Sequence, residues 1–200
     1  MLVLVCGVGQ RGWRRGESAG DGKRGRLVIR LNADGFWEFS LAFYCKPQVA
    51  VALLSLQDRR DADVNMLLAI CWLATLGYQL PIGGIEHIDA AVKPWRDKVV
   101  KPLREVRRRV KSDFGEEIGK VDQQSLHHTI LGAELDCERV SQRQIVLAAE
   151  PHCGRLQGKP AAELALPVMR AYLDLLPRTD LANEPAPEDE RDIAAILQLL

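Results

Sequence analysis

The chain lacks the features that would identify a membrane or secreted protein. No apolar stretch in its 200 residues approaches the roughly 18 residues needed to span a bilayer. Its start, a very short apolar run followed by basic residues, is unlike a secretory signal, which places a basic region before a longer apolar one. We therefore expect a cytoplasmic protein that does not enter a membrane.

Cysteine is also scarce, with five scattered residues and no C-x-x-C spacing. Zinc and redox motifs of that kind are therefore not indicated. Cys45 and Cys71 lie within apolar runs, which indicates buried thiols in a reducing compartment. The net charge is zero, so an electrostatic partner would have to meet a local patch. We expect no metal site and no cofactor.

Residues 1–33 have too little apolar content to bury a core, and they are rich in glycine and in positive charge. This composition predicts a disordered extension, or a start codon placed too far upstream. Gly7, Gly9 and Gly12 follow LVLVC as in a dinucleotide fingerprint. The residues after Gly12 are too glycine-rich for the helix that such a site needs, and no parallel β-α units follow.

Strand-like alternation is absent after this extension, and helical periodicity takes its place. The sequence predicts an all-α protein, a single bundle of about six to seven helices, with a helical domain at 34–176 and an acidic linker and short C-terminal helix at 177–200. Pro47 suits a helix start, Asp34 and Asp61 or Asp63 suit caps, and Gly77 suits a helix end. Pro94 and Pro102 should break or kink a helix at 86–111, and Pro167 should interrupt another at 160–176.

Three helices carry apolar faces. The first, at about 34–45, is apolar on two sides, so it is either central to the bundle or half of a dimer interface. Trp37 and Trp72 lie in the densest apolar runs and should be buried. Two later stripes comprise Trp95, Val99, Leu103, Val106 and Val110, and then Leu126, Ile130, Ala133, Cys137 and Val140. The second of these stripes should face the bundle.

The segment 93–111 is dense in basic residues, opposed only by Asp97 and Glu105. Its basic side, predicted to lie mostly opposite the apolar stripe, comprises Lys93, Lys101, Arg104, Arg107, Arg108 and Lys111. Such a face is ordinarily solvated, but it could bind an acidic partner or nucleic acid, or be covered by the acidic C-terminal stretch. No aromatic residues interleave it, so base stacking is not indicated.

A polar turn separates two apolar helices and contains Gln57, Asp58, Asp63 and Asn65. Clustered carboxylates at helix ends can hold Mg²⁺ for diphosphate chemistry. Such sites normally face a second acidic helix, and none is evident. Helix capping by Asp61 or Asp63 is the simpler interpretation, with Asp58 in water beside Arg59 and Arg60.

The run from Phe36 to Trp72 resembles the signature of a bacterial family known only as domain of unknown function 2390. The resemblance lies in Phe36-Trp37, Phe39-Ser40, Tyr44, Val49, Leu56-Gln57-Asp58, Asp63-Val64-Asn65, Leu67-Leu68 and Trp72. VKPLREVRR at 100–108 and AELDCE at 133–138 are similar to its later, weaker motifs. The resemblance covers about 34–176, and it implies a small helical protein without an established activity.

We interpret the sequence as a non-enzymatic interaction or adaptor module that uses the first helix, around Trp37, or the basic helix. The alternative is a small-molecule-binding or Mg-dependent enzyme domain built around Gln57, Asp58, Asp63 and Asn65. The direction of these four side chains separates the two hypotheses. Convergence on a cavity favours a ligand site, whereas water or helix N-termini favour the adaptor.

Overall fold

The computed structural model describes residues 31–112, 119–156, 158–177 and 187–200. Within these residues the chain forms seven helices, if α4, η2 and α5 are counted as the single continuous helix that they make. The all-α prediction is confirmed. The predicted disorder of the N-terminal extension falls, as far as residue 30, outside the described residues.

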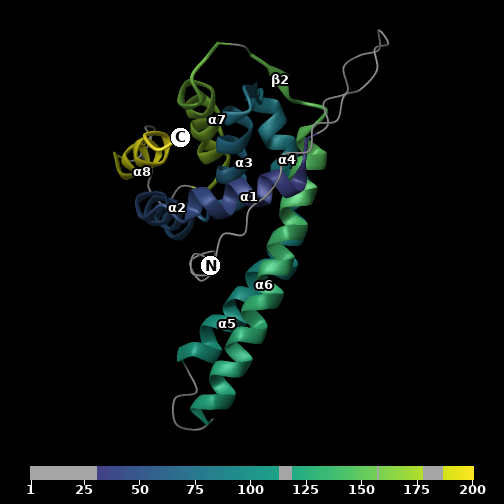
Figure 1. Cartoon of the computed structure of the whole chain (residues 1–200), viewed down its shortest axis with the longest axis vertical. Coiled ribbons are helices and arrows are strands. Elements are labelled where there is room, and N and C mark those ends of the chain that lie inside the picture. Colours follow the sequence, from purple (N-terminus) through teal and green to yellow (C-terminus); the bar gives the residue numbers. More distant parts are fainter. Residues whose placement is uncertain (1–30, 113–118, 157, 178–186) are drawn as a thin grey trace.

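Six helices pack into what we call the head, around α3 (Figure 1). Every residue of α3 from Val64 to Ala74 is buried, which makes it the central helix of the bundle. Phe36 stacks on Trp72 with 5.1 Å between ring centroids, so α1 is fixed against α3 by aromatic packing. The head helices are α1 (Ala33–Tyr44), α2 (Pro47–Arg60), α3 (Val64–Thr75), α4 (Ile82–Trp95), α7 (Ala161–Leu175) and α8 (Pro187–Leu197).

The other large feature is a pair of helices that extends away from the head (Figure 1). A π-helical turn, η2 (Arg96–Val100), joins α4 to α5 (Lys101–Ser112), and α5 packs along α6 (Lys120–Ala149). We call η2, α5 and residues 120–138 of α6 the arm. The rest of α6 packs against α1, α3 and α4 and so anchors the arm to the head.

Of the two predicted effects of Pro94 and Pro102, a break or a kink, the break is wrong, because the helix runs through both prolines. Each proline lacks an N–H donor, and between them the helix widens, with the Lys101 N–H bonded to the Arg96 carbonyl five residues back. Pro167 likewise lies inside an unbroken α7, whose core residues Val168 and Tyr172 hold it in place.

Other local predictions hold in part. Pro47 opens α2 and Asp63 caps α3, but Asn32 and not Asp34 caps α1. A two-residue antiparallel pair, β1 (Tyr78–Gln79) with β2 (Gly154–Arg155), was not predicted. The core also continues past the predicted domain limit at residue 176, because α8 contributes Ile193 and Ile196 to it.

Two burial predictions need correction. Trp72 and Cys71 are buried as expected, but Trp37 is only half-buried and lies under the Arg139 guanidinium, 5.1 Å from the ring centroid. Cys45 is exposed, because α1 ends one residue earlier and Cys45 occupies its C-cap.

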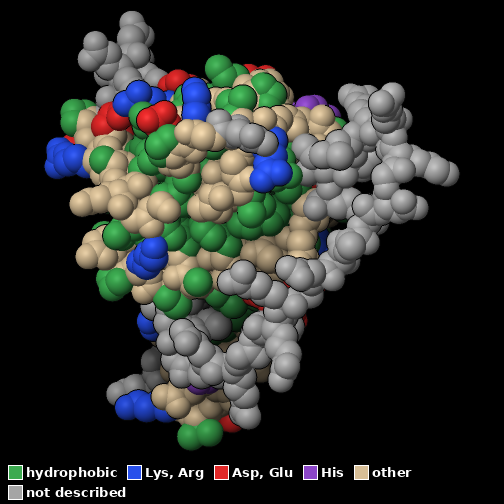
Figure 2. All heavy atoms as spheres, turned by 45° about the horizontal axis from the view of Figure 1, so that its top comes forward, with side chains coloured by type: hydrophobic (Ala, Val, Ile, Leu, Met, Phe, Trp, Pro, Cys, Tyr) green, Lys and Arg blue, Asp and Glu red, His purple; other side chains and the backbone are tan. Residues whose placement is uncertain are grey.

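The end of the head that carries β1 and β2 has a mostly apolar open groove of about 520 Å³. Leu80, Ile82 and Leu156 are among the residues that line it. Figure 2, in which the top of the view in Figure 1 comes forward, shows hydrophobic side chains gathered on the visible face of the head.

No helix in the described part of the chain is by itself long and apolar enough to cross a membrane. Helices α1 and α2 together would meet that measure, but they meet at a bend of 102°.

Candidate functional site

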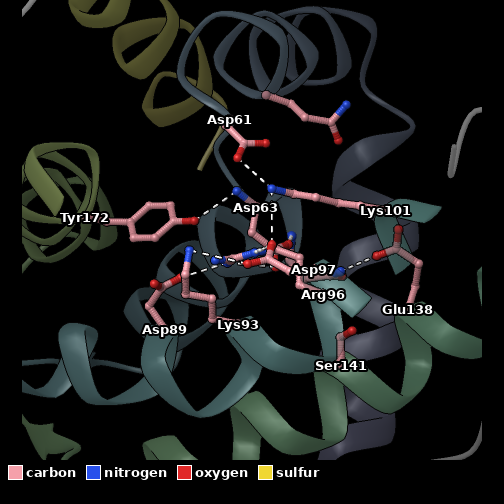
Figure 3. Close-up of polar contacts among 12 residues, drawn as sticks. Asp61, Asp63, Asp89, Lys93, Arg96, Asp97, Lys101, Glu138, Ser141 and Tyr172 are labelled. Atoms are coloured by element: carbon pink, nitrogen blue, oxygen red, sulfur yellow. Dashed lines mark hydrogen bonds and ion pairs between the residues drawn. The ribbon is translucent and has the colours of Figure 1, made fainter. Parts of the chain in front are cut away.

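We call the continuous helix formed by α4, η2 and α5 the long helix. The loop between α2 and α3 faces the long helix and α6 across a small cavity, which we call the polar cleft (Figure 3). The cavity measures about 20 Å³, enough for about one water molecule. Its polar lining comprises Gln57, Asp61, Asp63, Asn65, Arg96, Lys101, Arg104, Glu138 and Ser141.

Local backbone structure places the acidic residues of the loop. Asp61 ends α2 in the left-handed conformation, with φ of 52°, which turns the chain sharply. Asp63 caps α3, where its carboxylate accepts a hydrogen bond from the Asn65 N–H at 2.8 Å. The Asp63 N–H in turn donates to the Tyr172 hydroxyl at 2.9 Å, which ties the loop to α7.

Two cations from the long helix neutralise these carboxylates. The buried Arg96 donates to Asp89 at 2.7 Å and lies 3.4 Å from Asp63, while Lys101 lies 2.6 Å from Asp61 (Figure 3). Burial disfavours the charge on Arg96 and on Lys101. The adjacent carboxylates outweigh burial, so the pKa of each cation is raised. Both stay charged, and neither is left for an external anion without breaking an ion pair.

A chain of hydrogen bonds runs from the cleft into the core. Glu138 accepts from the Asn65 amide and, at 2.9 Å, from Arg104. The side-chain oxygen of Asn65, Oδ1, accepts a hydrogen bond from the Gln142 amide at 2.9 Å, and the same amide donates to the Ser40 hydroxyl at 3.0 Å. These contacts join α1, α3, α5 and α6. Replacing any one of these side chains by an apolar residue would leave its buried partner without a hydrogen bond.

Glu138 is a buried carboxylate at the centre of this network. Burial raises its pKa above the ordinary value, although the Arg104 guanidinium opposes that shift. Burial, with Glu138 adding to it, also raises the pKa of Tyr44 to about 12. The Tyr44 hydroxyl has no hydrogen-bond partner within the described residues. It lines a second hollow of about 10 Å³ beside Glu138, too small for an organic molecule.

The structure brings together three of the four residues proposed for the polar turn. Gln57, Asp63 and Asn65 all line the polar cleft. Asp58 does not, since it points outward, 68% exposed, with Arg108 3.8 Å away. It borders an outer groove of about 260 Å³ that shares Gln57 with the cleft. Trp37 is not part of either lining.

The sequence did not single out Arg96, Glu134, Glu138 or Gln142 as site residues. Glu134, Glu138 and Gln142 are spaced four apart, which puts them on one side of α6, and all three are buried. That spacing was the available signal. It was hidden because the apolar stripe that starts at Leu126 was taken to face the bundle, and this was wrong: Leu126 and Ala133 are exposed.

The basic side of the long helix also differs from expectation. Arg104 and Arg107 do not face solvent, because both form ion pairs with the buried Glu134 of α6. The π-turn adds a wider turn before α5, so the inward side passes through Arg96, Val100, Arg104 and Arg107. Lys93 and Arg108 are exposed beside Asp97 and Asp58, and Lys111 is exposed.

The acidic turn does not have the arrangement of a magnesium site. Asp58, Asp61 and Asp63 each lie against a cationic side chain and do not converge on one point. No group of three or more His, Cys, Asp or Glu side chains that could hold a metal ion occurs among the described residues.

Each of the two arm helices carries an apolar stripe, and helical periodicity places both stripes on the side of the arm away from the head. Lys101 and Arg108 mark the opposite side, where they approach Asp61 and Asp58 of the head. We call the side with the stripes the outer face. It comprises Trp95 at the end of α4, Val99 of η2, Leu103 and Val106 of α5, and Leu126, Ile130, Ala133 and Cys137 of α6. Val106 and Leu126 are 48% and 47% exposed, so much of this apolar surface is open to solvent.

The comparisons with known proteins identify one family. The model described as protein of unknown function (DUF2390) matches residues 35–145, more than half of the chain. No curated protein and no solved structure matches the chain.

Proposed function

The chain belongs to the DUF2390 family, and we propose that it is a non-enzymatic interaction module whose partner binds the outer face of the arm. The observation that carries this proposal is the pair of apolar stripes that lie there, with Val106 and Leu126 half-exposed. The proposed compartment is the cytoplasm, as the sequence indicates.

Amphipathic helices normally turn their apolar stripe toward the protein interior. In the arm the interior contacts are made largely by charged side chains, Arg104 and Arg107 with Glu134, and the apolar stripes lie to one side of them. Exposed apolar surface on paired helices is typical of a surface that another helix covers. This is why the outer face, and not the basic side, is our proposed binding surface.

The polar cleft supports the same proposal in a different way. Its cavity of about 20 Å³ has room for a water molecule, and its cations are paired with carboxylates. A substrate would have to open this network before it could reach Glu138. The cleft is therefore better suited to fixing α2, α3, α5 and α6 to one another.

Site-specific photo-crosslinking tests the proposal. A benzophenone amino acid replaces Val106 on the outer face, and a second variant carries it at Val121, which is 78% exposed on the arm but off that face. Both variants are expressed in the cells that make the protein and are then irradiated. We expect a discrete adduct from position 106 and none from position 121. No adduct from position 106, or equal adducts from both, would overturn the proposal.

A second candidate function, binding of a small polar ligand, is favoured by the convergence of Gln57, Asp63 and Asn65 on one cleft. The ligand would enter through the outer groove of about 260 Å³, whose lining includes Gln57 and Arg104. A thermal-shift screen of sugar phosphates, nucleotides and amino acids tests this. Stabilisation of the wild type that is lost in Gln57→Leu supports a ligand site, and its absence across the screen counts against one.

A further inference from the structure

The outer face has charged edges of opposite sign on its two helices. The α5 edge carries Lys98 and Arg109, both exposed and both without an ion pair among the described residues. The α6 edge carries Asp122 and Asp136, which are also exposed. The exposed Glu105 lies between the two basic residues, so the α5 edge is mainly basic and the α6 edge is acidic. An apolar centre with edges of opposite charge is the pattern by which paired helices select partner and orientation.

The contacts between α5 and α6 fix how these charges are aligned along the arm. The Trp95 indole N–H donates to the Cys137 carbonyl at the base, at 3.1 Å, and Gln123 donates to the Val110 carbonyl near the tip, at 2.7 Å. Lys98 on one edge is therefore level with Asp136 on the other. By the same alignment, Arg109 is level with Asp122.

This alignment distinguishes two ways of pairing the face with itself. A two-fold axis along the arm lays α5 of one copy over α6 of the other, so each basic residue meets an acidic one at its own level. A two-fold axis across the arm lays α5 over α5 and opposes Lys98 to Arg109, two positive charges. Charge favours the first arrangement.

We infer that a second copy of this chain covers the outer face, with the two arms parallel about a two-fold axis along their length. The pairing makes a four-helix bundle from two hairpins, with Val106 and Leu126 in its centre. This inference rests on the proposed function, since it names the partner of the same face.

Analytical ultracentrifugation of the purified full-length chain tests the pairing. We expect the wild type to sediment as a dimer at micromolar concentration. Val106→Asp and Leu126→Asp should each weaken the dimer by roughly a hundredfold, because the two-fold axis buries two unpaired charges. Val121→Asp is the matched control and should leave the dimer unchanged. Circular dichroism shows whether each variant is folded, and half-exposed positions should tolerate the change.

Charge reversal tests the orientation. Arg109→Glu should weaken the dimer by roughly tenfold, since it turns two attractive edge pairs into repulsive ones. Adding Asp122→Lys to it should restore the wild-type affinity. In the antiparallel arrangement Arg109→Glu would instead strengthen the dimer, because it would face Lys98. That outcome would overturn the parallel pairing.

The result also separates this inference from the proposed function. A monomeric wild type, together with a position-106 adduct to a different protein, would overturn the self-pairing and leave the interaction module standing. A monomeric wild type with no adduct would overturn both.

Discussion

The head and the arm are stabilised by different forces. In the head, α3 is buried at every position from Val64 to Ala74, and apolar side chains from the surrounding helices cover it. In the arm, α5 and α6 are joined by Arg104 and Arg107 around Glu134, with only Val110 and Leu131 as fully buried apolar residues of α5 and the start of α6.

This difference has consequences for function. An apolar core contains no titratable groups, so its stability depends little on pH, but it must be closed to be stable. Ion pairs cost desolvation when they are buried, and they hold two helices together while their apolar sides stay free. The head is therefore a closed apolar core, whereas the arm keeps part of its apolar surface open to solvent.

The largest effect should come from the head. Phe36→Ala removes a side chain that is 0% exposed and stacked on Trp72, so it should lower the free energy of unfolding by roughly 3–5 kcal/mol. Urea denaturation followed by circular dichroism measures this. Phe39→Ala, at a half-buried position in the same helix, is the control and should cost less than half as much. Equal losses would mean that α1 is not anchored through its inner face.

A smaller effect should come from the arm, and it should be local. Glu134→Ala leaves Arg104 and Arg107 partly buried without this partner, at a cost of about 2–3 kcal/mol. Hydrogen exchange should accelerate in α5 and at the start of α6 but not in α3. Glu134→Gln keeps a hydrogen-bond acceptor and should accelerate hydrogen exchange in the arm less than Glu134→Ala does. If α3 exchanges faster to the same extent, then head and arm unfold as one unit and the comparison fails.

Glu138 lies where head and arm meet, and it should make stability depend on pH. Its folded-state pKa is raised, so the folded chain holds the proton more tightly than the unfolded chain does. Its contribution to stability is present below the ordinary pKa of 4.5 and is lost as pH rises through the folded pKa. Compared with Glu138→Gln, the wild type should lose up to about 1.4 kcal/mol per pH unit across that window. Parallel pH profiles would contradict this.

The smallest effect should come from the exposed ion pairs. Arg108 and Asp58 are 59% and 68% exposed and 3.8 Å apart. Arg108→Ala should therefore change the free energy of unfolding by less than about 0.5 kcal/mol. A loss as large as that of Glu134→Ala would show that the arm is held by its head-facing side and not by its contact with α6.

Local signals explain why the helices themselves were predictable. Pro47 at the start of α2 and Asp63 before α3 determine their ends through the backbone alone. Apolar density was enough to predict that Cys71 and Trp72 are buried. Half of the polar cleft was also visible, since Gln57, Asp63 and Asn65 come from one short stretch of chain.

The other half of the cleft depends on long-range contacts. Arg96 and Glu138 come from helices that meet this stretch only in the folded chain, and each looks in the sequence like an ordinary surface charge. A charge is stable in the interior only with a partner, and the partner is supplied by another helix. Reading one helix at a time could not show it.

The sequence alone determined the fold class, the starts of α2 and α3 and the side chains that share each stripe, because these follow from backbone geometry and periodicity. Only the tertiary structure decided what each stripe faces. The π-turn at Arg96–Val100 shifts the side of α5 that points inward, and the pairing of Arg104 with Glu134 turns charges inward and apolar residues outward. Periodicity shows which side chains lie together, but the identity of their neighbours is settled only when the helices pack.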